Sequence, residues 1–175
     1  MTIPPKNGYE AARRAALLLR GEVIDLFAQV ECAIGDVLVR AAIMPEYKAL
    51  KLALPSLMGQ KLERLRTLST KAGPLQTQAN GVASLVEKLA SFERYRHFMA
   101  HGVVEVALKE SGEAIYIFRM VCAPSKEYPD STLVLTRPEA QSRTARLAGT
   151  VKSLVAALDP IDAKAGKKGL SSPRP

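Results

Sequence analysis

The order of apolar and polar positions predicts three helices before residue 102. Apolar residues recur at helical spacing over residues 8–43, so this range is expected to form a long first helix. Leucines at similar spacing over residues 56–69 predict a second helix, with Ser56 as its N-terminal cap. A third helix is predicted over residues 75–100, and Gly102 stands where a left-handed C-terminal cap is expected.

The period of the pattern then changes from helical to extended. The stretches VVEVALKE and AIYIFRMV are β-branched and aromatic, and Ser111 and Gly112 between them are typical of a tight turn. The stretch STLVLT, residues 131–136, predicts a third short strand after a polar loop. A small antiparallel sheet is therefore expected after the third helix.

The pattern predicts a final helix over residues 138–158. Thr136 or Arg137 is its expected cap, and Glu139 carries a negative charge close to the positive end of the helix. These elements together indicate a mainly α fold, a helical bundle with a small antiparallel β-hairpin insertion before the last helix.

The size and composition agree with one helical domain. A chain of 175 residues can bury a core without disulfides, and we expect a single domain over residues 8–158 with flexible termini at 1–7 and 159–175. Hydrophobic residues make up 47% of the chain and aromatic residues only 5%, with no Trp, which favours closely packed helices rich in Ala, Leu and Val.

The charge and the cysteines constrain the partner and the compartment. A net charge of +8 favours phosphate-bearing partners over basic ones, although part of it lies in the tail KAGKKGLSSPRP. Cys32 and Cys122 are far apart and are expected to be buried thiols in a reducing compartment. Since no apolar run approaches the length of a signal or a membrane span, a cytoplasmic location without membrane contact is predicted.

The stretch ERYRHFMAHGV, residues 93–103, contains both histidines of the chain, His97 and His101. Their spacing puts both on one helix face, as in zinc sites, but no HExxH glutamate or nearby cysteine completes a ligand set. We therefore expect no metal and no other cofactor. Nucleophilic hydrolysis is also disfavoured, because the chain has no GxSxG turn, and phosphate-binding glycine loops are lacking as well.

Metal-free phosphodiester cleavage fits the residue types of this stretch better. Such a reaction needs a base for the ribose 2′-hydroxyl, an acid for the leaving oxygen and a cation for the phosphorane charge. Histidine suits the first two tasks because its ordinary pKa is about 6.5. Arginine suits the third because its planar fork matches phosphate oxygens.

The segment RHFMAHG, residues 96–102, resembles the R-x(4 to 6)-H signature of the HEPN superfamily. Helices before the motif, a hairpin after it and a closing helix agree with that layout. The resemblance implies a helical bundle that forms a homodimer, in which two motifs share a cleft and cleave RNA without metal in the catalytic members. On the matching positions, Arg96 is the phosphate-binding cation and His101 the acid or base. His97 stands where Asn is frequent, and it is expected to contact phosphate or orient the site.

Two further residues are candidates for supporting roles. Arg94 lies two helical turns before His101, so we expect it to be a second phosphate contact in the same cleft. Glu31 interrupts the apolar stripe of the first helix, and a half-buried carboxylate needs a partner. It either pairs with an arginine of the third helix or positions Arg96 or His101.

The leading prediction is a HEPN-like ribonuclease that cleaves unpaired RNA through 2′-hydroxyl attack. A toxin of a toxin–antitoxin or defence pair, with an antitoxin protein as partner, is one form of this hypothesis. The alternative is a non-catalytic HEPN-like module that binds RNA or a nucleotide, or acts through protein contacts. Helix capping alone also explains basic residues and Gly at this helix end.

Overall fold

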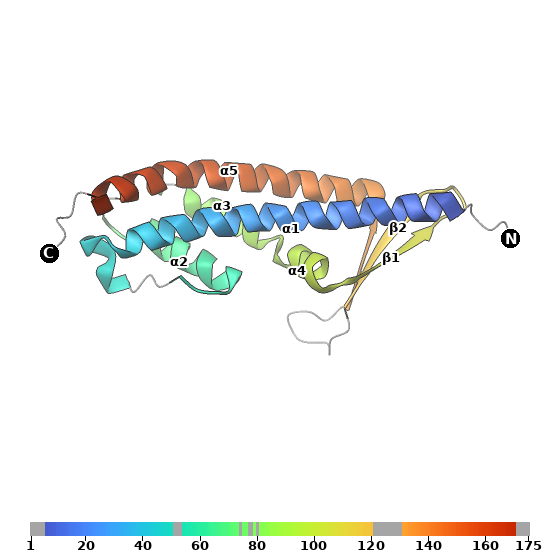
Figure 1. Ribbon diagram of the computed structural model, residues 1–175, viewed down its shortest axis with the longest axis horizontal. Helices are drawn as coiled ribbons and strands as arrows, with labels where there is room; N and C mark the ends of the chain where they lie inside the picture. The colour runs from blue at the N-terminus through green and yellow to red at the C-terminus, as the bar shows by residue number, and fades with distance from the viewer. Residues whose placement is uncertain are drawn as a thin grey trace. The chain divides into compact units, whose positions relative to one another are not determined.

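The protein has a mainly α fold with one small sheet before the last helix, which confirms the predicted fold class. The computed structural model describes residues 6–50, 54–73, 75–76, 79, 81–120 and 131–170. Its helices are α1 (Lys6–Ala42), the 3₁₀ helix η1 (Pro45–Leu50), α2 (Met58–Thr70), α3 (Val82–Ala90), α4 (Glu93–His101) and α5 (Arg137–Leu170). Its strands are β1 (Val103–Leu108), β2 (Ala114–Arg119) and β3 (Thr132–Thr136). Figure 1 traces their order along the chain.

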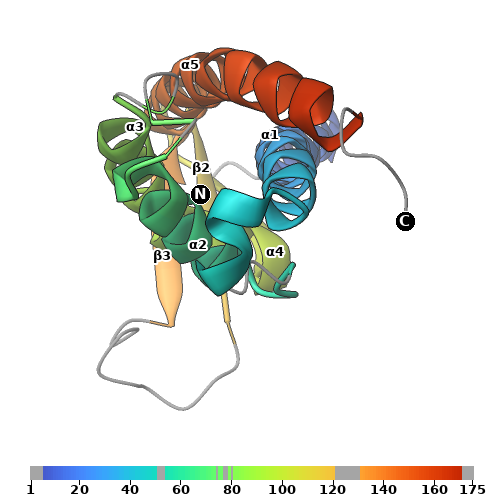
Figure 2. The same ribbon diagram turned by 90° about the vertical axis from the view of Figure 1, so that its left-hand side faces the viewer.

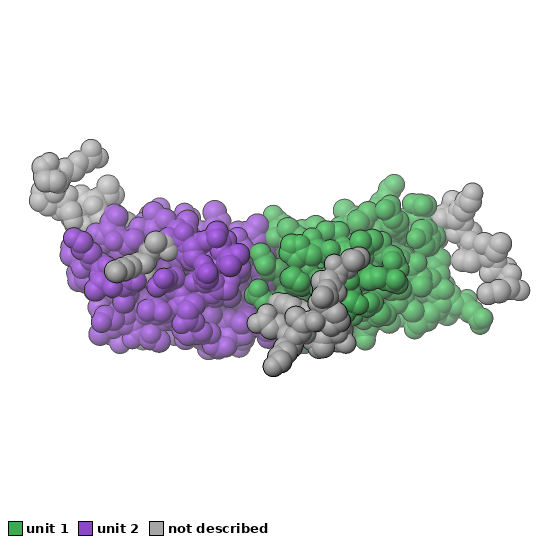
Figure 3. All heavy atoms as spheres, turned by 90° about the horizontal axis from the view of Figure 1, so that it is seen from below, with its two compact units in different colours: residues 1–26, 92–148 green, residues 27–91, 149–175 purple. Residues whose placement is uncertain are grey.

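The chain forms two compact units, which are coloured separately in Figure 3. Unit 1 comprises residues 1–26 and 92–148, and unit 2 comprises residues 27–91 and 149–175. Helices α1 and α5 each contribute one part to each unit. The candidate histidines belong to unit 1.

The sheet of unit 1 is antiparallel, with the strand order β1-β2-β3. Tyr116 of β2 stands opposite both Val106 of β1 and Leu135 of β3, and all three side chains are buried. The next row places Ile117 opposite the exposed Val134. Because side chains alternate between the two faces of a strand, one face of the sheet supplies the core of unit 1.

The turn between β1 and β2 confirms the predicted hairpin. Gly112 adopts a φ of 81°, a left-handed conformation that glycine enters without steric cost. Its N–H donates to the carbonyl of Lys109 at 2.9 Å, and the N–H of Lys109 donates to the carbonyl of Glu113 at 2.9 Å. These bonds fix the register of the two strands.

A reciprocal cap joins β3 directly to α5. Oε2 of Glu139 accepts from the backbone N–H of Thr136 at 2.8 Å, and the Glu139 N–H donates to Oγ1 of Thr136 at 3.4 Å. The backbone hydrogen bond from Thr136 is the main cause that lowers the pKa of Glu139. This pattern is a capping box. Of the two expected caps, Thr136 and Arg137, the structure therefore has Thr136.

A buried polar contact connects α4 to the first part of α5. The hydroxyl oxygens of Tyr95 and Thr144 lie 3.2 Å apart, and both side chains are buried. Burial raises the pKa of Tyr95, which keeps its hydroxyl protonated at neutral pH. The contact therefore satisfies two polar groups in the core of unit 1.

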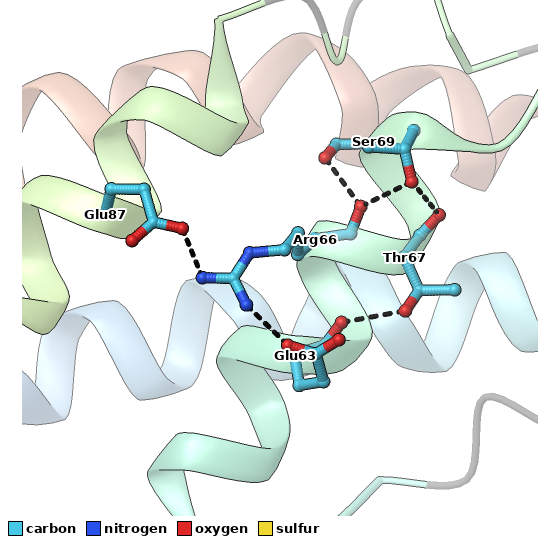
Figure 4. Close-up of polar contacts among 6 residues, drawn as sticks. Glu63, Arg66, Thr67, Ser69 and Glu87 are labelled. Atoms are coloured by element: carbon cyan, nitrogen blue, oxygen red, sulfur yellow. Dashed lines mark hydrogen bonds and ion pairs between the residues drawn. The ribbon is translucent and has the colours of Figure 1, made fainter.

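Unit 2 is built from apolar stripes on α2, α3 and its parts of α1 and α5. The buried residues of its α1 part are Phe27, Val30, Ile34, Val37, Leu38 and Ala41. Helices α2 and α3 contact each other, and Figure 2 shows them side by side. On their surface, Arg66 of α2 pairs with Glu63 and with Glu87 of α3 (Figure 4). Because these side chains are exposed, the pairs add little stability.

The third helix predicted over residues 75–100 is wrong, because the structure has two helices, α3 and α4, in its place. Gly81, with a φ of 83°, stands at the N-terminus of α3. After α3 the hydroxyl of Ser91 donates back to the carbonyl of Lys88 at 2.6 Å. Such local bonds compete with helical hydrogen bonds and explain a turn between the two helices.

Two smaller expectations also need correction. The cap of α2 is Leu57, which makes no side-chain cap bond, so Ser56 is not the cap. Helix α5 does not end at Leu158 but continues to Leu170 through Pro160, which places helix within the predicted flexible terminus. The buried Ile161 extends the apolar stripe of α5 beyond Leu158 and gives a reason for this continuation.

Cys32 is exposed, so its predicted burial is wrong. Cys122 lies outside the described residues. In the described part of the chain, no helix combines the length and the apolar character that crossing a membrane requires.

A tight contact in unit 2 surrounds Tyr47 of η1. Its hydroxyl accepts a hydrogen bond from the backbone N–H of Leu75 at 2.9 Å, and its side chain is fully buried. A Cβ added at Gly73 would lie 2.6 Å from the Tyr47 hydroxyl oxygen. Only glycine therefore allows the chain to pass this buried ring without a shift.

We predict that Gly73→Ala lowers the free energy of unfolding by about 1–3 kcal/mol, because the buried ring of Tyr47 must move. The control is Gly149→Ala in α5, where an added Cβ meets no described atom within 4 Å. This control should raise stability by about 0.4–1 kcal/mol. Denaturant unfolding of both variants measures the effects, and equal stability of the two variants would contradict the packing described around Tyr47.

Candidate functional site

The candidate site lies on the last turns of α4, in unit 1. Tyr95, Phe98 and Met99 are buried and anchor the helix, while Arg96 and His97 are half-buried and His101 is exposed. The apolar residues thus fix one face of α4 in the core. The same anchoring leaves the two histidines accessible to solvent.

The structure brings the two histidines together. The ring centroids of His97 and His101 lie 5.0 Å apart, with the ring planes at 61°. This arrangement follows from their spacing, since residues four apart are neighbours on a helix surface. The prediction that both histidines share one helix face is confirmed.

The surroundings of His97 favour its neutral form. Partial burial is the main cause that lowers its pKa, and the nearby His101 and Arg96 lower it further. Glu93 acts in the opposite direction. Since the ordinary pKa of histidine is about 6.5, His97 is mainly uncharged at pH 7 and can accept a proton.

The two arginines of the stretch differ in their surroundings. The positive charge of Arg96 contributes to the lowered pKa of His97, so Arg96 belongs to the electrostatic environment of the histidine pair. The guanidinium carbon of Arg94 lies 5.7 Å from the centroid of the Phe98 ring. This is a cation–π distance, which gives Arg94 a packing role. Its role as a second phosphate contact stays a prediction.

Glu31 belongs to unit 2 and has Lys61 of α2 as one partner. Its Oε2 lies 3.3 Å from Nζ of Lys61, and both side chains are largely shielded from solvent. Lys61 thus supplies the counter-charge that a half-buried carboxylate needs. A partner from α2 was not among the expected ones, and the positioning of Arg96 or His101 by Glu31 stays a prediction.

The end of α4 is shaped by the lack of a side chain at Gly102. The N–H of Gly102 donates to the carbonyl of Phe98 at 2.8 Å. A Cβ at this position would lie 2.6 Å from that carbonyl oxygen and 3.2 Å from Cβ of Phe118 in β2. Its backbone is extended, with φ −74° and ψ 140°, so the predicted left-handed cap is wrong. Glycine is required here by space and not by its φ angle.

Arg20 of α1 is the residue that sequence reasoning missed. Its Nη2 donates to the carbonyl of Ala100 at 2.9 Å, and its Nη1 donates to the carbonyl of Gly102 at 3.2 Å. These two acceptors immediately precede and follow His101. No local pattern indicates this contact, because donor and acceptors are 80 or more residues apart.

Within the described part of the chain, no three His, Cys, Asp or Glu side chains gather closely enough to hold a metal ion. His97 and His101 form a close pair of imidazoles, and the positive charge of Arg96 acts on His97. Such a set can remove a proton, supply a proton and bind an anion.

Comparisons with models of protein families, with curated proteins and with solved structures find no match to this chain. The resemblance to the HEPN superfamily stays a prediction.

We predict that Gly102→Ala lowers the free energy of unfolding by about 1–3 kcal/mol, since the added Cβ has no space between α4 and β2. Gly21→Ala in α1 is the matched control, because a Cβ there meets no described atom within 4 Å. Denaturant unfolding compares the two variants with the parent. A Gly102→Ala protein as stable as the parent would show that the helix end is not tightly packed.

We also predict that an NMR titration places the His97 pKa below its ordinary value of about 6.5. Replacing Arg96 with Gln should raise this pKa only in part, because burial is the larger cause. The pKa of His97 is lower in the folded protein than in the unfolded chain. Below about pH 6.5 the unfolded chain therefore binds more protons than the folded protein. Stability from this group is thus present above that pH and is lost as the pH falls.

The His97→Gln variant identifies the His97 signal and should weaken the loss of stability between about pH 7.5 and 5.5. A His97 pKa above the ordinary value, or one that falls in Arg96→Gln, would contradict the described electrostatics.

Proposed function

We propose that the protein is a metal-independent RNA endonuclease of HEPN type, with its active site on the last turns of α4. The observation that carries the proposal is the close pair of His97 and His101 with the charge of Arg96 beside it. Two imidazoles and a guanidinium are the groups that phosphodiester cleavage through a neighbouring hydroxyl requires.

In the proposed reaction, neutral His97 accepts the proton of the ribose 2′-hydroxyl. The 2′-oxygen attacks phosphorus, and the bond from phosphorus to the 5′-oxygen breaks. Protonated His101 gives its proton to the departing 5′-oxygen, so the products carry a 2′,3′-cyclic phosphate and a 5′-hydroxyl. Arg96 binds the non-bridging phosphate oxygens as negative charge builds on them.

The lowered pKa of His97 supports this division of roles. A general base has to be unprotonated before the reaction, and burial with two nearby basic groups favours that state. His101 is more exposed than His97. The assignment gives His97 a direct role where the HEPN resemblance alone implied a supporting one.

The remaining parts of the proposal concern partners and compartment. RNA is the substrate, and the net charge of +8 favours its approach. A homodimer that brings two α4 motifs together would supply a second Arg and His set to the cleft. Cytoplasmic RNA and an antitoxin protein are the partners expected if the protein is a toxin.

We predict that the purified protein cleaves a mixed RNA substrate in EDTA, and that Arg96→Ala, His97→Ala and His101→Ala each lower the rate by about 10²–10⁴-fold. Each variant removes a proton carrier or the phosphate-binding cation. Arg64→Ala, on the exposed surface of α2, is the control and should keep the parent rate. Circular dichroism and size-exclusion chromatography verify the fold and the oligomeric state of each variant.

Equal cleavage by the parent and the three variants would remove the assignment to α4. A parent protein that binds RNA without cleaving it would instead favour the non-catalytic binding module.

A further inference from the structure

The end of an α-helix leaves its last carbonyl groups without partners inside the helix. In α4, the carbonyl of Phe98 accepts from Gly102, as described above. The carbonyl of Ala100 needs a donor from elsewhere, and Nη2 of Arg20 supplies it at 2.9 Å. The same guanidinium reaches the carbonyl of Gly102 through Nη1 at 3.2 Å.

This contact is local to His101. Its two acceptors are the residues on either side of His101, so one planar group holds the backbone before and after the histidine. Arginine suits this geometry because its N–H donors are fixed in one plane, whereas a lysine ammonium is a single point of charge. The positive charge also lies at the negative end of the helix dipole, where it is favourable.

The packing around Arg20 partly shields its two hydrogen bonds from water. Both hydrogen bonds are partly buried, so water competes less for the carbonyl oxygens than at an open surface. Gly102 also lies close to Phe118 of β2, with no space for a Cβ. The backbone next to His101 thus has two tertiary neighbours, a guanidinium from α1 and a strand of the sheet.

We infer that Arg20 is a positioning residue that fixes His101 for catalysis while making no contact with the substrate itself. The inference rests on the proposed function, because His101 needs a fixed place only if it transfers a proton at a defined position. A catalytic group displaced by about 1 Å can lose about 100-fold in rate. Arg20 therefore controls the chemical step through the backbone of α4.

The first test does not depend on activity. Hydrogen exchange is measured on the full chain for the parent, for Arg20→Gln and for the control Arg13→Gln, whose exposed side chain also lies on α1. In Arg20→Gln, the amide of Gly102 should exchange about tenfold faster or more, because two charge-assisted hydrogen bonds are lost. Exchange in α2 should match the parent, and Arg13→Gln should match the parent throughout.

An unchanged Gly102 amide in Arg20→Gln, or a rise of equal size in α2, would overturn the inference. The second outcome would mean that Arg20 supports the whole fold and not this helix end.

The second test measures RNA cleavage by the same proteins in EDTA. Arg20→Gln should lower kcat by about tenfold or more and leave KM within about twofold, because substrate binding is not touched. Arg20→Lys should recover part of kcat, since an ammonium can reach one of the two carbonyls. A higher KM with unchanged kcat would overturn the inference and make Arg20 an RNA contact.

The two tests separate the failure of this inference from that of the proposed function. If the parent does not cleave RNA, the proposed function fails, while the exchange of the Gly102 amide still decides whether Arg20 holds the helix end. If the parent cleaves RNA and Arg20→Gln cleaves it equally well, only the positioning role fails.

Discussion

The lack of space for a side chain at Gly102 is the constraint on which the candidate site depends. Because this residue has no Cβ, α4 can end against the carbonyl of Phe98 and β1 can begin at the next residue beside β2. The same close approach leaves carbonyl groups at the helix end within reach of Arg20. The lack of space at Gly102 therefore fixes the positions of both His101 and the start of β1.

The chemistry of the site follows from how α4 is anchored. Burial of Tyr95, Phe98 and Met99 turns the remaining face outward, and helical spacing then makes neighbours of His97 and His101. Partial burial, His101 and Arg96 lower the pKa of His97, while the side chain of His101 is exposed. Two identical side chains on one helix therefore have different surroundings, which is a common way to separate an acid from a base.

Local patterns in the sequence predicted the parts of the fold that depend on local interactions. The hairpin at Gly112 and the long first helix follow from residue spacing and turn chemistry. The cap of α5 was narrowed to Thr136 or Arg137, and the structure has Thr136. The break at Ser91 did not follow from the apolar pattern, because it depends on the hydrogen bond from the serine hydroxyl back to the carbonyl of Lys88. The continuation of α5 through Pro160 did not follow either, because it depends on the burial of Ile161.

The candidate site, like the fold, was predicted only where it depends on local spacing. The pair of histidines follows from their spacing, whereas the contact from Arg20 joins residues far apart in the chain. The extended backbone at Gly102 and the exposure of Cys32 depend likewise on tertiary packing, which no local pattern contains.

The most direct measurement of the central claim is the chemistry of the RNA ends produced in EDTA. Cleavage by proton transfer between two histidines requires the ribose 2′-hydroxyl, so mass spectrometry should find a 2′,3′-cyclic phosphate and a 5′-hydroxyl. A substrate with a 2′-deoxyribose at the cleaved position should remain intact. Products with a 5′-phosphate, or cleavage of the deoxy-substituted substrate, would contradict the account.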